Sequence, residues 1–215
     1  MKGISYIIIF TTLFTLSLHA QTAQETAKNI LDNTAMAFRA DGGIKADFIA
    51  KVFDKKQLSE ETQGTIQLKG EKFLLKTNDV IVWFDGKTQW TYWIENDEVN
   101  VTTPTAEELQ STNPYALLSG YQKEFEYQKG TKTLFRGKPV NEILLTANAH
   151  NKDRMHIRLY ITEKTYQLMY IETEQQNGNR SEITITEYQT KKTYDDALFR
   201  FNSKEYPEVE IIDLR

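Results

Sequence analysis

The stretch Val80–Ile94 reads VIVWFDGKTQWTYWI and holds all three tryptophans of the protein. Two apolar runs flank Asp85-Gly86, a dipeptide that readily takes the positive φ values of a two-residue hairpin turn and pairs Phe84 with Lys87. Cross-strand partners point to the same side, so one face carries Ile81, Trp83, Trp90, Tyr92 and Ile94. The other face carries Val80, Val82, Phe84, Gln89, Thr91 and Trp93. Neither face is cleanly polar, so this sheet must be covered on both sides, or be covered once and hold a ligand; on residue type alone, core packing is the commoner role.

Residues 1–20 have the features of a secretory signal peptide. Lys2 supplies one positive charge, a mainly apolar run extends from Ile4 to Leu18, and the small residue Ala20 follows. The run is too short and too often interrupted by Thr and Ser for a membrane span. We therefore expect cleavage after Ala20, export of the protein, and a single domain over residues 21–215.

Charge and cysteine content exclude several classes of protein. The 26 basic and 30 acidic residues give a net charge of −4, which argues against an electrostatic nucleic-acid binder. The chain has no cysteine. Disulfides, thiolate metal sites, a cysteine nucleophile and a lipid anchor on an N-terminal cysteine are therefore excluded.

The rest of the chain predicts an α+β, mainly β domain. Residues 22–39 have apolar side chains at helical spacing, and Asp41-Gly42-Gly43 ends this amphipathic helix. Period-two strands follow, and two short helices at 103–109 and 113–118 interrupt them, the second with Asn113 as its cap and Gly120 beyond its end. Strands resume at 121–128, and 196–201 is expected as a last short strand, with 209–214 as a sheet edge. A sheet of about ten sequential antiparallel strands curls and has a concave apolar side, which the helices are able to cover.

The search for catalytic or metal-binding residues predicts no enzyme and no cofactor. His150 and His156 have no second histidine or carboxylate at ligand spacing, so each is expected in solvent. No serine lies in a G-x-S-x-G context and no phosphate-binding glycine loop is present. The adjacent carboxylates, such as Glu107-Glu108, diverge from each other on strands or helices and are interpreted as solvated charges.

Three motifs occur in order along the chain: QGTIQL at 63–68, DGKTQWTY at 85–92 and NPYALL at 113–118. Their order and spacing resemble the LolA family of periplasmic carriers of outer-membrane lipoproteins. The family has a G-x-L strand, a D-G-K-x-L/I-W-x-Y hairpin and an x-P-x-x-L-L helix in this order. The similarity extends from the first helix to the tail at 197–201 and so covers nearly the whole mature chain.

The resemblance implies a fold and a function. The fold is an unclosed, half antiparallel β-barrel of about ten or eleven strands, with an N-terminal helix and short inserted helices capping the concave face. Its apolar cavity holds the acyl chains of lipoproteins, which a LolA-like protein collects from an inner-membrane ABC exporter and delivers to an outer-membrane acceptor, without a cofactor or covalent chemistry. The residues expected to contact acyl chains are Ile30, Leu31, Phe38, Phe48, Val52, Ile81, Trp83, Trp90, Tyr92, Tyr115, Leu117 and Leu118. Within the hairpin we expect Trp90 and Tyr92 to face inward, because the opposite face would line the cavity with Lys87, Gln89 and Thr91.

One departure concerns the segment after the G-x-L strand. Well-studied members have Pro and an Arg there that holds the lid closed, whereas this chain has Lys69-Gly70-Glu71-Lys72. We expect Lys69 to substitute for this Arg only in part, because an ammonium lacks the planar fork of a guanidinium.

Two other functions fit the same pattern. One is a lipid- or lipoprotein-sensing regulatory domain, as in the periplasmic regulator RseB, which is similar to LolA in one domain. The other is a glycan-binding module that uses Trp83, Trp90 or Trp93 as a stacking platform. Exposed tryptophans side by side on one flat face would favour the glycan module.

Overall fold

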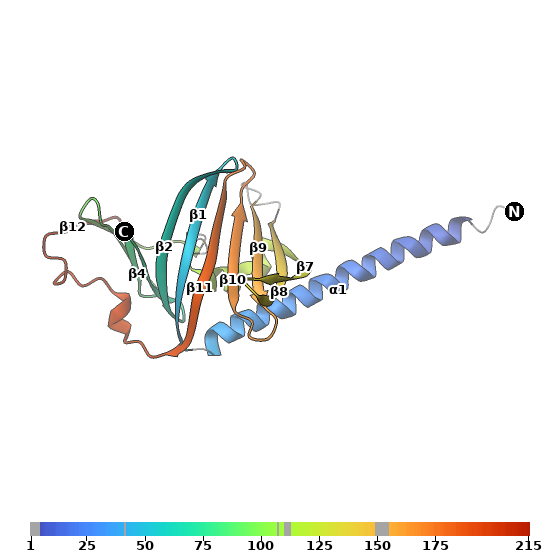
Figure 1. The fold of residues 1–215 in the computed structure, drawn as a ribbon, viewed down its shortest axis with the longest axis horizontal. Helices are drawn as coiled ribbons and strands as arrows, with labels where there is room; N and C mark the ends of the chain where they lie inside the picture. Colours follow the sequence, from blue (N-terminus) through green and yellow to red (C-terminus); the bar gives the residue numbers. More distant parts are fainter. Residues whose placement is uncertain (1–4, 41, 107, 110–112, 149–154) are drawn as a thin grey trace.

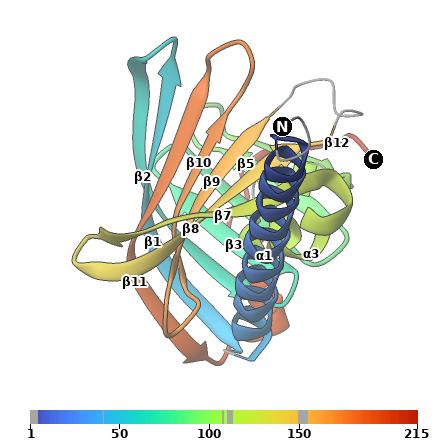
Figure 2. The same ribbon diagram turned by 90° about the vertical axis from the view of Figure 1, so that its right-hand side faces the viewer.

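The structure is a computed structural model that describes residues 5–40, 42–106, 108–109, 113–148 and 155–215, with the backbone alone for residues 5–22, 114 and 115. Helices α1 (Ser5–Ala40) and α3 (Pro114–Glu124) lie on one side of a single curled sheet (Figures 1 and 2). The strands are β1 (Gly43–Asp54), β2 (Gln57–Lys69), β3 (Lys72–Thr77), β4 (Val80–Phe84), β5 (Gln89–Trp93), β6 (Glu98–Thr102), β7 (Phe125–Phe135), β8 (Lys138–Ala147), β9 (His156–Thr162), β10 (Leu168–Glu174), β11 (Arg180–Lys192) and β12 (Glu210–Asp213).

The sheet is open, with strand order β12-β6-β5-β4-β3-β2-β1-β11-β10-β9-β8-β7. Neighbouring strands are antiparallel except at one edge, where β12 runs parallel to β6. The pairing of β1 with β11, for example Ala46 with Tyr188, joins the two halves of the chain at the middle of the sheet. The described part of the sheet has 12 strands, so the predicted class, a mainly β protein with an unclosed half-barrel and covering helices, is confirmed.

Several element boundaries differ from the sequence predictions. The helix predicted for 113–118 continues through Gly120 to Glu124, so the strand expected from Tyr121 begins only at Phe125. The tail forms a short 3-10 helix, η1 (Asp196–Phe199), instead of a strand, because the Asp195 side chain accepts a hydrogen bond from the Ala197 backbone N–H. The predicted edge strand near the C-terminus is confirmed as β12.

The register of the tryptophan-rich hairpin differs by two residues from the prediction. Phe84 pairs with Gln89 and Trp83 with Trp90, so the connection has four residues instead of two. The reason is the Asp85 carboxylate, which accepts hydrogen bonds from the Lys87 and Thr88 backbone N–H groups at 3.0 and 2.9 Å and stabilises the wider loop. Because side chains alternate with period two, a shift of two residues leaves the composition of both faces unchanged.

Two separate apolar cores cover the two faces of the sheet. The larger packs α1 and α3 against the concave face and includes Leu31, Leu118 and Phe84. The smaller lies on the opposite, convex face, where η1 and the following tail cover Trp83 and Tyr92. Both faces are covered, as the apolar character of the hairpin requires.

Candidate functional site

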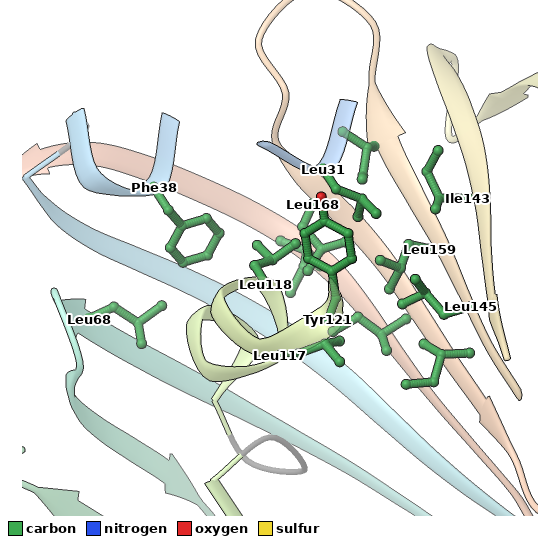
Figure 3. Packing of buried hydrophobic residues seen from close by; sticks show 14 of the residues in the cluster. Leu31, Phe38, Leu68, Leu117, Leu118, Tyr121, Ile143, Leu145, Leu159 and Leu168 are labelled. Atoms are coloured by element: carbon green, nitrogen blue, oxygen red, sulfur yellow. The ribbon is translucent and has the colours of Figure 1, made fainter. Parts of the chain in front are cut away.

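The candidate site is the apolar layer between the two helices and the concave face of the sheet. Leu31 of α1 and Leu117 and Leu118 of α3 point into this layer and are 0%, 4% and 2% exposed (Figure 3). Their helical spacing places the apolar side of each helix toward the sheet, while Lys28 and Lys123 lie on more exposed positions. This arrangement excludes water and offers mainly aliphatic and aromatic surface.

The strands β8, β9 and β10 form the floor of the layer beneath α3. Ile143, Leu145 and Leu159 are at most 1% exposed and project toward the helices (Figure 3). Strict alternation in β9 places Ile157, Leu159 and Ile161 on the concave side and leaves Arg158 and Tyr160 on the convex side. An apolar chain in this layer would meet a floor made of branched aliphatic side chains.

Gly64 explains the glycine of the G-x-L motif. It pairs with Phe48 across β1 and β2, and a Cβ on Gly64 would lie 2.5 Å from Phe48 Cζ and 2.6 Å from the Lys76 carbonyl oxygen. The absence of a side chain therefore lets the Phe48 ring lie across the neighbouring strand on the concave face.

Helix α3 is tied to α1 by a polar group at the rim of the layer. The Tyr121 hydroxyl donates to Asp32 Oδ1 at 2.9 Å, and Lys28 Nζ donates to Asp32 Oδ2 at 2.6 Å. Partial burial raises the pKa of Asp32, but the hydrogen bonds from Lys28 and Tyr121 outweigh it, and the pKa lies below the usual 3.8. Burial and the Asp32 carboxylate raise the pKa of Tyr121, so at neutral pH the pair is a phenol donating to a carboxylate.

The start of α3 has a separate attachment. The Asn113 side-chain amide donates to the Glu71 carbonyl oxygen at 3.1 Å, and Asn113 is 1% exposed. This bond joins the residue before α3 to the turn between β2 and β3, which is the place where the resemblance implies a lid contact.

Lys69 does not take that role. Its ammonium donates to the Tyr194 carbonyl oxygen at 2.8 Å and to Asp196 Oδ1 at 2.9 Å, on the convex side of the sheet. The expectation that Lys69 substitutes for the lid-holding Arg is therefore wrong, because alternation along β2 directs Leu68 to the concave side and Lys69 away from it.

Six of the predicted residues come together in the concave layer. They are Ile30, Leu31, Phe38, Phe48, Leu117 and Leu118. Val52 has the same parity in β1 as Phe48, but it lies near the end of the long β1–β2 hairpin and is 41% exposed. The Tyr115 side chain lies outside the described residues.

Four predicted residues lie on the wrong face. Ile81, Trp83, Trp90 and Tyr92 belong to the convex core, so the expectation that Trp90 and Tyr92 face inward is wrong. Their cover is the tail: the Trp83 ring packs edge-on against Phe201 at 5.5 Å and against Tyr206 at 5.7 Å between ring centroids. The sequence pattern left open whether the hairpin has one cover or two, and it did not indicate that the tail supplies the second.

The hairpin face that points to the concave side of the sheet carries both apolar and polar side chains. Val82 and Phe84 belong to the concave core, whereas Gln89 and Thr91 hydrogen-bond to each other through their side chains at 3.3 Å, and Trp93 is 45% exposed. Trp93 thus lies on the face opposite Trp83 and Trp90. The three tryptophans form no common stacking platform, which removes the arrangement that would favour a glycan-binding module.

Many residues of the layer were not predicted as site residues. Among them are Ile44, Ile66, Leu68, Phe73, Tyr121, Phe125, Ile143, Leu145, Ile157, Leu159, Ile161, Leu168 and Ile185. The alternation of Ile157, Leu159 and Ile161 indicates one apolar face of a strand and could have identified these residues. Tyr121 was missed because it was assigned to a strand.

Two further observations concern the described residues. No group of three or more His, Asp or Glu side chains is arranged there to hold a metal ion. In the same part of the chain, no helix is both long enough and apolar enough to cross a membrane. His150 lies outside the described residues.

Solved structures share the fold at low sequence identity. A structure of an uncharacterised conserved protein from Thermus thermophilus superimposes with a TM-score of 0.61 and 9% identity, covering 87% of this chain and 99% of the other. A LolA superfamily protein from Nitrosomonas europaea gives a TM-score of 0.45 and 8% identity over 81% of this chain and 97% of the other. The MucA/MucB complex of Pseudomonas aeruginosa gives 0.48 and 11% identity over 83% and 62%.

Sequence comparison gives the family. None of the curated proteins compared with the chain matches it. The family model described as outer membrane lipoprotein carrier protein LolA matches residues 16–135, which include α1 from residue 16 onward, β1 to β6, α3 and β7. The chain therefore belongs to the LolA family of outer membrane lipoprotein carrier proteins.

Proposed function

We propose that this protein is a periplasmic carrier that shelters the acyl chains of lipoproteins between its helices and the concave face and moves them from the inner to the outer membrane. The observation that supports the proposal most is the position of α3. Its Leu117, Leu118 and Tyr121 cover a floor of aliphatic side chains, so displacement of this one helix would open the apolar layer to a lipid.

The free energy that is lost when the apolar side chains of α3 leave the floor is similar to the free energy gained when an acyl chain is buried there. Relative to exposure in water, burying three large side chains contributes about 5–9 kcal/mol, and burying about a dozen methylenes of an acyl chain contributes about 10 kcal/mol. An acyl chain that enters between α3 and the floor therefore offsets most of the α3 contacts that it displaces, and the apolar side of α3 then covers the chain. Small net differences suit a carrier, which must release its cargo as well as take it up.

The short length of α3 supports its displacement. An 11-residue helix is only marginally stable on its own, so α3 depends on its packing, on the Tyr121–Asp32 bond and on the Asn113–Glu71 bond. Removing it leaves the sheet ladder intact. The carrier function needs no cofactor and no covalent step; its partners are acylated lipoproteins and, through the family, an inner-membrane ABC exporter.

The direct test is the recovery of bound cargo. Protein purified from the periplasm without detergent is analysed by native mass spectrometry for added mass that matches a lipoprotein or an acylated peptide. In parallel, purified protein is titrated with a fluorescent triacylated peptide and with the same peptide lacking its acyl chains. We expect binding of the acylated form alone. Failure to bind either form, with the protein folded, would overturn the proposal.

A further inference from the structure

The β7–β8 hairpin carries an unusual concentration of positive charge. Lys129, Lys132, Arg136 and Lys138 lie between Gln128 and Asn141, and no Asp or Glu occurs among them, although the whole chain has a net charge of −4. The residues from Thr131 to Pro139 are exposed except for the partly buried Phe135. Figure 2 shows this hairpin reaching outward from the sheet, away from α1.

A bulge in β7 gives the hairpin its direction. The register shifts between Lys129 and Lys132, and the Glu142 carboxylate accepts a 3.1 Å hydrogen bond from the Thr131 backbone N–H. A Cβ on Gly130 would lie 2.2 Å from Glu142 Oε2, so the Glu142 side chain packs directly on the backbone at Gly130. Bulges bend a strand and change the direction of the side chains beyond them.

Beyond the bulge, one aromatic residue fixes the hairpin and its neighbour is left in solvent. The Phe135 ring lies 5.2 Å from the Tyr160 ring and 5.3 Å from the Tyr170 ring on the convex face. Leu134 points the other way and is 71% exposed, the highest fraction among the exposed large hydrophobic residues described. The turn itself is tight, with Arg136 at φ 50° and Gly137 at φ 76°.

The basic side chains are mostly unpaired. Lys132 binds Glu163 at 2.8 Å, but within the described part of the chain Lys129, Arg136 and Lys138 make no ion pair. Lysines on an edge strand also prevent edge-to-edge aggregation, and β7 is the last strand of the sheet. That role does not account for Leu134, because an exposed leucine at an edge increases the risk of aggregation.

We propose that the β7–β8 hairpin docks the protein on the surface of an anionic phospholipid bilayer. Arg136 in the turn and Lys138, which pairs with Phe135 on the side of the hairpin opposite Leu134, would contact lipid phosphates on both sides of the hairpin tip, and Leu134 would enter the headgroup region. Basic and apolar side chains combined in this way are typical of interfacial binding. The inference concerns the outside of the molecule and does not rest on the proposed carriage of acyl chains, although it would bring a carrier to its membranes.

Vesicle flotation tests the proposal. The mature chain is mixed with vesicles of one part phosphatidylglycerol to three parts phosphatidylcholine, or with vesicles of phosphatidylcholine alone, at low and high salt. We expect binding to the anionic vesicles that weakens with salt. The variant Arg136→Asn/Lys138→Gln should lose about fivefold in partitioning for each charge removed, or roughly 25-fold in total. Asn is chosen because it tolerates the positive φ of residue 136.

A matched control removes two charges from another hairpin. Lys55 and Lys56 form the β1–β2 turn with φ 46° and 77°, so Lys55→Asn/Lys56→Asn changes the net charge equally and keeps the turn. This control should bind vesicles nearly as well as the wild type, and Leu134→Ser should reduce the binding that persists at high salt.

Three results would overturn the inference. The first is absence of binding to anionic vesicles, and the second is an equal loss of binding in the two double variants. The third is aggregation of Arg136→Asn/Lys138→Gln with unchanged vesicle binding, because that result would assign the charges to protection of the sheet edge. The first result would leave an acidic protein as the remaining partner for this surface. The same variants should take up the triacylated peptide normally, so failure of this inference is distinguishable from failure of the carrier function.

Discussion

The Tyr121 hydroxyl of α3 donates a 2.9 Å hydrogen bond to the Asp32 carboxylate of α1, across 89 residues of sequence. The Tyr121 ring is buried in the apolar layer at 3% exposure, while its hydroxyl reaches the rim. One side chain thus belongs both to the core and to the polar attachment of the helix that covers it.

Replacing Tyr121 with Phe keeps the ring and removes this attachment. We expect the free energy of unfolding to fall by about 1 kcal/mol, because solvent at the partly exposed Asp32 weakens the bond. Uptake of a fluorescent triacylated peptide should become faster, since α3 leaves the sheet more easily. Stopped-flow fluorescence measures the rate. Tyr160→Phe, on the convex face, is the matched control and should leave the uptake rate unchanged; equal acceleration by both variants would contradict the assignment.

The attachment of α3 should also depend on acid. The pKa of Asp32 is lower in the folded protein than its usual 3.8, so its contribution to stability is complete above pH 3.8 and is lost as the pH falls through the folded pKa. Urea unfolding of the wild type and of Asp32→Asn, compared from neutral pH downward, isolates this contribution. The stability difference between them should be constant near neutral pH and shrink below pH 3.8. A difference that grows on acidification would show that the pKa is shifted in the opposite direction.

A charge on the inner side of α3 should prevent uptake of lipid. Leu117 is 4% exposed above the floor of the layer, and Leu117→Glu would place a carboxylate against the acyl chains. We expect at least a tenfold loss of affinity for the triacylated peptide, since an unpaired charge opposes burial by more than about 1.4 kcal/mol. Leu58→Glu is the control, because Leu58 is 50% exposed at the far end of the β1–β2 hairpin. Circular dichroism establishes that the variant is folded, and normal uptake by folded Leu117→Glu would show that the α3 face is assigned wrongly.

The convex core should contribute to stability without contributing to uptake. Phe199 is fully buried there, and Phe199→Ala should lower the free energy of unfolding by about 3–5 kcal/mol. Lipid affinity of the folded fraction should be unchanged, because Phe199 packs on the face opposite the acyl-chain layer. Fluorescence of Trp83 and Trp90 monitors loosening of the tail in the same sample. A large loss of affinity at full folding would place part of the lipid site on the convex side.

Gly64 should tolerate no side chain. In Gly64→Ala the new methyl would lie 2.6 Å from the Lys76 carbonyl oxygen as well as against the Phe48 ring, and we expect a loss of about 1–3 kcal/mol in urea unfolding. Combining it with Phe48→Leu should restore only part of this loss, because the contact with the backbone of β3 persists. Full restoration by the second substitution would assign the whole effect to the ring.

Much of the secondary structure follows from the local spacing of apolar residues in the sequence. Helical spacing from Ala27 to Phe38 and alternation in β1, β2 and β9 specify helix, strands and the side of each that is apolar, because each period fits only one backbone geometry. The order of three motifs led to the family, and six of the twelve predicted site residues lie together in the concave layer.

Sequence alone determined that neither face of the Val80–Ile94 hairpin is cleanly polar, so that each face needs either a cover or a ligand. Only the tertiary structure decided which cover lies where. The tail from η1 onward packs on Trp83, Trp90 and Tyr92, held by the bonds of Lys69 and Lys72 to Asp196, while α1 and α3 cover Val82 and Phe84. The physical reason is that alternation divides the side chains between two faces of the sheet but does not say which face is concave. That choice depends on contacts with the tail, more than a hundred positions away in the chain.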